Sequence, residues 1–345
     1  MRSTAQFTVI DVHTAGSPVR VVTGGLGPVP GRSMVEKRDF LRTHRDDVRT
    51  MLMYEPRGHA AMSGSILFEP SDPRADIGIV FMEVSGWLPL CGHGTIGTVT
   101  AVIESGIVPM TQPVTEVVLE VPAGLVRARA EVSKGSVTSV TISSVPSYLA
   151  VADVVVDVPA WGHLSVDVAY GGNFYAIVNA CDLSIELVPS QADRILSAAQ
   201  GIRAVLDKAL DPSYPGKPWI HGVTHVMLVE PVAGDPKTAR NTVFFGENGI
   251  ARDPCGTGTS ARMAQLLARG ELEVGEAFVH EGLIGTAYQG RVESTVRVGD
   301  HAAALTTVQG SAFITGTATF MLDPGDPLPR GFGIGYGSDV PRTVS

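Results

Sequence analysis

Residues 91–106 read CGHGTIGTVTAVIESG, and residues 255–270 read CGTGTSARMAQLLARG. Both stretches begin Cys-Gly-x-Gly-Thr, continue with about ten residues that favour a helix, and close on a glycine. The chain has 345 residues and only three cysteines, and two of them stand at the head of the same motif. We therefore expect two copies of one α/β unit rather than a short-period repeat.

Each motif predicts a buried helix that begins just after a cysteine. Apolar or small residues cover much of the circumference of both segments, and Gly106 and Gly270 stand where a glycine commonly ends a helix. The free backbone N–H groups at a helix N-terminus favour negative charge. We therefore expect the pKa of each thiol to lie below its ordinary value of about 8.5. The same N–H groups, reached over glycines, can hold a carboxylate.

Two such thiols predict acid–base chemistry. If Cys91 and Cys255 bracket one small anion, one thiol can take a proton from its α-carbon while the other gives a proton to the opposite face.

Two other interpretations stay open. The glycines at 92–97 fit the dinucleotide pattern G-x-G-x-x-G, with Glu116 about 20 residues further on, but SGWLPL separates them from the preceding predicted strand. The other interpretation is a pair of buried structural cysteines.

Alternating and helical patterns extend this picture outward from the motifs. Residues 6–25 alternate around a Gly/Pro turn and predict a strand pair, and residues 33–53 predict one charged, solvent-covered helix. Residues 189–208 predict the corresponding helix of the second half, and residues 325–345 a turn-rich, frayed end. Further strands are predicted at 61–68, 77–84, 114–121 and 125–132.

Composition narrows the class of protein. The net charge of −9, with no block of Lys or Arg, argues against a nucleic-acid or membrane-surface partner. No apolar run reaches the length of a bilayer span, the start lacks the regions of a signal peptide, and three cysteines form no disulfide framework. We expect a cytoplasmic protein. No His, Cys or carboxylate set shows metal-ligand spacing.

The motifs together resemble the proline racemase family, which also holds hydroxyproline 2-epimerases and 3-hydroxyproline dehydratases. The resemblance is carried in order by DVHTAGSPVRVV, EPRGH, LCGHGTIG, AYGGNFYAIV, DPCGTGTSARMA, HEGLIGTAYQG and ITGTATFMLDPGDP. It implies an α/β (α+β) fold of the diaminopimelate-epimerase type: two pseudo-symmetric domains, each a β-barrel-like mixed sheet around a central helix. We expect residues 1–135 with 312–345 in the first domain and 136–311 in the second. The resemblance also implies a homodimer, and neither pyridoxal phosphate nor a metal.

The resemblance assigns roles by position. Cys91 and Cys255 are implied to be the acid/base thiols. The implied substrate-binding residues are Gly92, His93, Gly256, Thr257, Ser63, Asp253, Phe245 and Leu88. Leu88 and Phe245 correspond to walls of the pocket, and His93 to a contact with the ring or carboxylate of the substrate.

Two departures from the family pattern bear on the substrate. The family reads Asp-Arg-Ser-Pro-Cys before the second thiol, and that Asp binds the substrate ammonium. This chain has Ala251 there, with Asp253 as the candidate replacement. Ser63 stands where proline racemases have a bulky Phe, which favours a hydroxylated substrate. The predicted reaction is inversion at the α-carbon of a cyclic imino acid, with 4-hydroxyproline ahead of proline. The alternatives are 3-hydroxyproline dehydration and a non-catalytic binder of a small carboxylate.

Overall fold

The computed structural model describes residues 3–246 and 249–333. Its chain divides into two compact units: residues 1–140, 247–249 and 311–345 form unit 1, and residues 141–246 and 250–310 form unit 2. Strand β8 (Ser136–Ser143) carries the chain from the first unit to the second. The predicted frayed end lies outside the described residues from 334 onward. None of the described helices has the length and hydropathy to cross a membrane.

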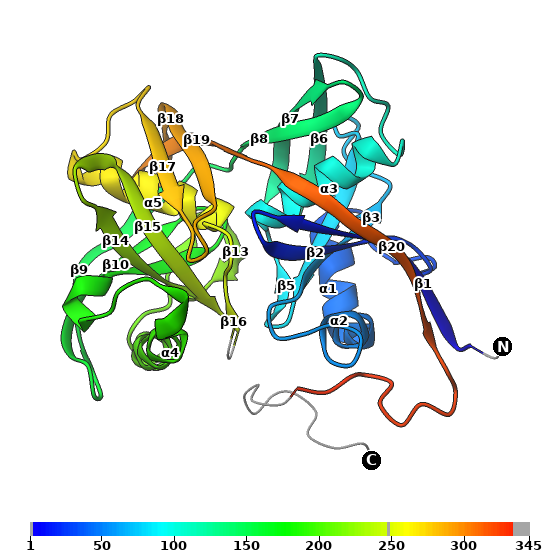
Figure 1. Ribbon diagram of the computed structural model, residues 1–345, viewed down its shortest axis with the longest axis horizontal. Helices are drawn as coiled ribbons and strands as arrows, with labels where there is room; N and C mark the ends of the chain where they lie inside the picture. Colours follow the sequence, from blue (N-terminus) through cyan, green and yellow to red (C-terminus); the bar gives the residue numbers. More distant parts are fainter. Residues whose placement is uncertain (1–2, 247–248, 334–345) are drawn as a thin grey trace. The chain divides into compact units, whose positions relative to one another are not determined.

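Unit 1 begins with the predicted strand pair. Strands β1 (Ala5–Thr14) and β2 (Ser17–Gly24) form an antiparallel hairpin, and β20 (Ala312–Leu322) adds antiparallel to the other edge of β1. The sheet continues from β2 through parallel β3 (Ser63–Phe68) and antiparallel β4 (Ile77–Glu83). The remaining strands of this unit are β5 (Gly86–Leu88), β6 (Val114–Val121) and β7 (Gly124–Ser133). Helix α3 (Gly92–Glu104) contacts β1, β2, β3, β7 and β20, so it lies at the centre of the unit (Figure 1).

The charged segment 33–53 differs from its prediction. It forms two helices, α1 (Met34–His44) and α2 (Asp46–Met53), because Arg45 leaves helical geometry at φ −138°. Arg49 is also buried rather than solvent-covered. Its guanidinium pairs with Asp46 at 2.8 Å and donates to the carbonyl oxygen of Val84 at 2.9 Å. A buried guanidinium needs such partners, so this arginine holds α2 against the sheet.

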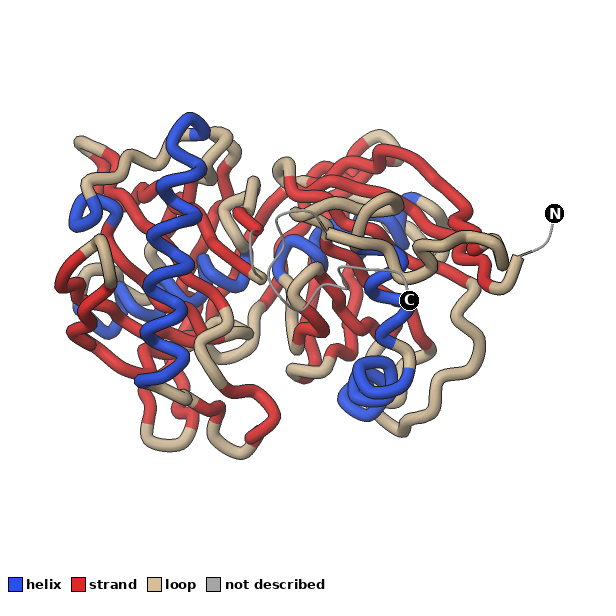
Figure 2. The backbone as a smooth tube through the Cα atoms, turned by 90° about the horizontal axis from the view of Figure 1, so that it is seen from below, coloured by secondary structure: helices blue, strands red, loops and turns tan. Residues whose placement is uncertain are grey.

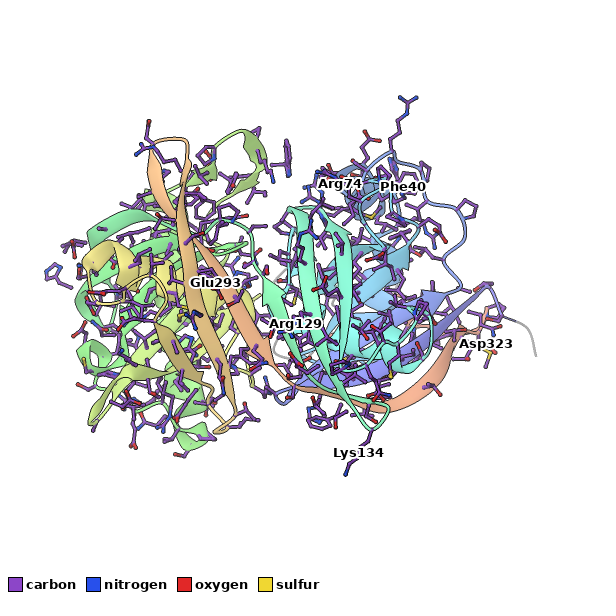
Figure 3. The ribbon with its side chains drawn as sticks, turned by 90° about the horizontal axis from the view of Figure 1, so that it is seen from above. Phe40, Arg74, Arg129, Lys134, Glu293 and Asp323 are labelled. Atoms are coloured by element: carbon purple, nitrogen blue, oxygen red, sulfur yellow. The ribbon has the colours of Figure 1, made fainter. Side chains whose placement is uncertain are left out.

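Tight turns close the hairpins of unit 1. Lys134 and Gly135 connect β7 to β8, and both adopt positive φ, at 53° and 80°. That combination matches a two-residue hairpin turn, which follows the twist of the flanking strands. Figure 3 shows Lys134 projecting from the tip of this hairpin into solvent.

Unit 2 repeats the plan. Strands β9 (Tyr148–Val158), β10 (Gly162–Tyr170) and β11 (Phe174–Asn179) run antiparallel in sequence order. A crossover through η1 (Ala180–Leu183), η2 (Pro189–Gln191) and α4 (Ala192–Ala209) leads to β14 (His225–Val232), which is parallel to β11. The other strands are β12 (Ser213–Tyr214), β13 (Lys217–His221), β15 (Asp235–Phe245), β16 (Gly249–Ile250), β17 (Ala277–Glu281), β18 (Ala287–Val298) and β19 (His301–Gly310).

The two helices of unit 2 have different surroundings. Helix α4 crosses one face of the strands, where it contacts β9, β14 and β15 (Figure 2). Helix α5 (Gly256–Arg269) contacts β9, β10, β11, β18 and β19, and most of its residues are buried. Each unit therefore has outer helices and one central helix that begins directly after a cysteine of the repeated motif, as the sequence predicts.

Candidate active site

Cys91 is the residue that precedes α3. Its backbone is extended, with φ −132° and ψ 116°, and its carbonyl oxygen accepts the first helical bond from the N–H of Thr95 at 2.9 Å. A Cβ on Gly94 would lie 2.9 Å from the sulfur of Cys91, closer than real Cβ contacts allow. The second glycine of the motif therefore leaves room for the thiol. Gly106 follows the helix with φ 76°, in agreement with the predicted helix end.

The other predicted site residues of unit 1 surround this helix. The imidazole Nδ1 of His93 lies 3.6 Å from the sulfur of Cys91, and Gly92 is the buried first residue of α3. Ser63 begins β3 and is 2% exposed, and its hydroxyl has no hydrogen-bond partner among the described residues. Leu88 ends β5 and is buried beside the sheet.

Cys255 occupies the same place before α5 but in another backbone conformation. Its φ of 62° and ψ of 102° lie in a region that side chains rarely adopt. The carboxylate of Asp253 holds this turn, because its Oδ2 accepts from the N–H of Cys255 at 2.8 Å and from the hydroxyl of Tyr288 at 2.9 Å. A Cβ on Gly258 would lie 3.0 Å from the sulfur, so this glycine again clears the thiol. Gly270 ends the helix at φ 71°.

The electrostatics of Cys255 contradict the prediction for a thiol at a helix N-terminus. Burial, followed by the nearby carboxylate of Asp253, raises the pKa of this thiol to about 12. Hydrogen bonds from Tyr175, the Gly258 N–H and Thr257 lower the pKa, but by less. The expected depression is therefore wrong for Cys255, since burial and a neighbouring negative charge outweigh the helix terminus. At neutral pH this group is a thiol, the form that can donate a proton.

Two tyrosines contact this motif that the sequence analysis did not assign. The hydroxyl of Tyr175 lies 2.6 Å from that of Thr257 and 3.4 Å from the sulfur of Cys255. Tyr288 binds Asp253. Both tyrosines are fully buried, and both lie inside motifs that resemble the family, AYGGNFYAIV and HEGLIGTAYQG. A polar aromatic residue within a family motif was the sequence feature that could have identified them as site residues.

The rest of the predicted set in unit 2 lies at the end of β15 and in the segment that leads into α5. Gly256 is the buried first residue of the helix, and Phe245 ends β15 with 7% exposure. Ala251 is also buried, and its N–H donates to the carbonyl oxygen of Val243 at 2.8 Å. Asp253 is 0% exposed and its Oδ2 is engaged by protein donors. Its predicted role at the substrate amine stays a prediction, alongside its evident role in the turn before Cys255.

The predicted residues thus form two sets. Unit 1 holds Cys91, Gly92, His93, Ser63 and Leu88, and unit 2 holds Cys255, Gly256, Thr257, Asp253 and Phe245. Within the described residues, no group of three His, Cys, Asp or Glu side chains is arranged to hold a metal ion. Each set contains one thiol at the start of a buried helix, and a glycine leaves space beside its sulfur.

Comparisons with known proteins agree on one family. The family model described as proline racemase matches residues 9–333. The chain is 46% identical to a 4-hydroxyproline 2-epimerase of Streptosporangium roseum over 96% of this chain and 99% of the relative. It is 41% identical to a proline racemase of Clostridioides difficile, over 96% of this chain and 99% of the relative.

Solved structures confirm the fold. A hydroxyproline epimerase from Agrobacterium vitis, solved with bound trans-4-hydroxy-L-proline, superimposes with a TM-score of 0.92 at 32% identity, covering 97% of each chain. A predicted epimerase of Pseudomonas aeruginosa shares the fold alone, with a TM-score of 0.56 at 12% identity over 92% of this chain and 100% of the other. The expected α/β fold of the epimerase type is therefore correct.

Proposed function

Because the chain belongs to the proline racemase family, an isomerase family, we propose that it inverts the α-carbon of a cyclic imino acid. Cys91 and Cys255 act as the two acid/base groups, on opposite faces of one substrate. The observation that supports this most is the matched pair of motifs: each thiol stands at the start of a buried helix, and each is cleared by the glycine three residues on.

The protonation of the thiols gives the direction of one half-reaction. Cys255 is protonated in the ligand-free state, so it supplies the proton while Cys91 takes the α-proton of the substrate. The opposite epimer reacts with the roles exchanged. The helix N–H groups at Gly92 and Gly256 stabilise the substrate carboxylate, which carries developing negative charge as the α-proton leaves. No cofactor takes part in these proton transfers.

The proposed substrate is 4-hydroxyproline ahead of proline. Relatives in this family are named for both substrates, and the hydroxyproline epimerase from Agrobacterium vitis was solved with the hydroxylated imino acid bound. In this chain, the buried hydroxyl of Ser63 without a partner supports a substrate that brings its own hydroxyl. A buried unpaired hydroxyl costs free energy that such a substrate would recover.

Hydrogen exchange in deuterated water tests the proposal. Each 4-hydroxyproline epimer and proline would be incubated with the enzyme, and α-deuterium and inversion would be followed together. Cys91→Ala and Cys255→Ala should each reduce inversion by about a hundredfold or more. Cys181→Ala, at the exposed third cysteine, is the matched control and should leave the rate unchanged. Exchange that survives in a Cys91→Ala, Cys255→Ala double variant would rule out the thiols as the acid/base pair. Release of a dehydrated product from 3-hydroxyproline would identify the dehydratase reaction instead.

We further propose a homodimer in the cytoplasm. None of the three cysteines, all of which lie within the described residues, forms a disulfide, and reduced thiols suit a reducing compartment. Light scattering coupled to size exclusion would measure the mass, which should be twice that of the 36.2 kDa chain.

A further inference from the structure

Unit 2 contains a polar pocket that the proposed reaction does not use. Its volume is about 240 Å³, and it lies where the second half of α5 passes β10 and β11. Arg262, Gln265 and Arg269 of α5 line it at spacings of three and four residues, which places them on one face of the helix. This face is seven or more residues beyond Cys255, so the pocket is separate from the thiol.

Part of the lining is an ion network that is internally complete. The carboxylate of Asp167 accepts from Arg269 at 2.7 and 2.8 Å, from the N–H of Asp153 at 2.9 Å, and from Gln265. Arg269 also pairs with Asp153 at 2.8 Å. Burial alone would raise the pKa of Asp167, but its hydrogen bonds to Arg269 and Gln265 keep that pKa below the ordinary value. The two carboxylates and one guanidinium leave one net negative charge, and the network supplies hydrogen-bond partners to all three groups.

Arg262 is different, because its guanidinium forms no ion pair, although the carboxylates of Glu271 and Asp167 are near enough to favour its charged form. Its one hydrogen bond goes to the amide oxygen of Gln265, and its buried Nε has no hydrogen-bond partner among the described residues. No ion pair joins it to a carboxylate in the part of the chain that the structure describes. This half-buried guanidinium keeps a donor without a protein partner, so it can bind an anionic group.

Glu271 supplies the complementary charge at the edge of the same pocket. Its side chain is exposed. Burial lowers the pKa of Arg262, and the carboxylates of Glu271 and Asp167 oppose that shift without forming an ion pair with Arg262. Ser165 and Asn179 add neutral hydrogen-bonding groups. Outside the Asp153–Asp167–Arg269 network, which carries one net negative charge, the charged side chains that line the pocket are Arg262 and Glu271. A simple anion such as phosphate would satisfy Arg262 but would be repelled by Glu271.

We propose that this pocket binds a zwitterionic amino or imino acid, with the ligand carboxylate on Arg262 and its ammonium on Glu271. The volume accommodates a molecule of that size together with water. The site is independent of the thiols, so the proposal does not rest on the proposed reaction.

Equilibrium dialysis of the whole protein tests the site with named probes: the twenty standard amino acids, both 4-hydroxyproline epimers, and inorganic phosphate. At least one zwitterion should bind the native chain, and both Arg262→Gln and Glu271→Gln should weaken that binding about tenfold or more. Arg291→Gln, at an exposed arginine outside the pocket, is the matched control and should change nothing. Circular dichroism would verify folding of each variant, and Glu271→Gln is exposed enough to be tolerated.

Three results would overturn the site. These are no zwitterion bound, binding that both variants retain, or phosphate binding that Glu271→Gln strengthens while zwitterions stay weak. Binding at the proposed catalytic site is distinguished by its persistence in both Arg262→Gln and Glu271→Gln. Deuterium exchange at the substrate α-carbon should continue in Arg262→Gln and Glu271→Gln.

Discussion

The two cysteine motifs share their letters but not their surroundings. Cys91 has an extended backbone and an imidazole beside its sulfur, whereas Cys255 has a positive φ and lies beside a buried carboxylate. Gly94 and Gly258, in contrast, have the same role, because each leaves space for the sulfur of the cysteine three residues before it. The repeated motif therefore leaves space beside each sulfur, while burial and the carboxylate of Asp253, outside the motif, raise the pKa of Cys255. In a two-thiol acid/base pair each thiol accepts a proton from one epimer and donates one to the other, so the difference affects how each thiol is held and not which roles it can take.

The largest expected effect comes from removing the shared clearance. In Gly258→Ala, the new Cβ would lie 3.0 Å from the sulfur of Cys255 and 2.5 Å from Cε of Met227. Met227 can move, but the sulfur belongs to the same helix turn and must shift. Because a misplaced catalytic group loses most of its effect, inversion should fall about a hundredfold. Gly94→Ala should have a comparable effect at Cys91. Steady-state inversion rates measure both.

A glycine far from the thiols provides the control for these two Gly→Ala substitutions. Gly201 lies in α4, where a Cβ would approach Cγ1 of Val158 at 3.0 Å and no thiol is near. Gly201→Ala should keep full activity. If Gly94→Ala and Gly258→Ala were also active, the matched glycines would have no role in placing the thiols.

The next effect concerns a contact that only the second motif has. Tyr175→Phe removes the hydroxyl that lies against Thr257 and the sulfur of Cys255. Because this hydrogen bond favours the thiolate, its loss should raise the pKa of Cys255 further and slow inversion by about tenfold. Inversion rates measure the slowing, and the pH profile of Cys255 alkylation, read by peptide mass spectrometry, should shift to higher pH. Slower inversion with an unchanged alkylation profile would indicate a packing role instead.

Much of this architecture could be predicted from the sequence because it is local. The alternation of residues 114–121 gives the bounds of β6 without error, and the glycines after each motif mark the helix ends. The break at Arg45 could not be predicted, because the helical pattern continues across it. The pKa of Cys255 could not either. It depends on burial, and on Tyr175, which is 80 residues away in sequence.

A smaller effect tests the carboxylate beside Cys255. Asp253→Asn keeps an oxygen that can accept from the N–H of Cys255 but removes the negative charge. The pKa of the thiol should fall, and its alkylation by iodoacetamide at pH 8 should quicken several-fold. Peptide mass spectrometry separates this reaction from that of exposed Cys181, which is an internal control. An unchanged rate would leave burial as the cause of the raised pKa.

Ala251→Asp, which restores the family carboxylate, should improve activity on unmodified imino acids.

The smallest expected effect is on stability at alkaline pH. The folded pKa of Cys255, at about 12, lies above the ordinary value of 9.0, so folding favours its protonated form. Its contribution to the free energy of unfolding is therefore complete below about pH 9 and is lost as the pH rises from about 9 to 12. The loss approaches about 1.4 kcal/mol per pH unit within that range, because the unfolded chain releases a proton that the folded chain keeps.

Urea unfolding of the native protein and of Cys255→Ala at pH 8 and pH 10 would measure this loss of stability, since the other groups titrate equally in both proteins. The stability difference between the two proteins should shrink by about 1 kcal/mol at pH 10. A constant difference would mean that Cys255 titrates near its ordinary value, and the contrast between the two motifs would then rest on geometry alone.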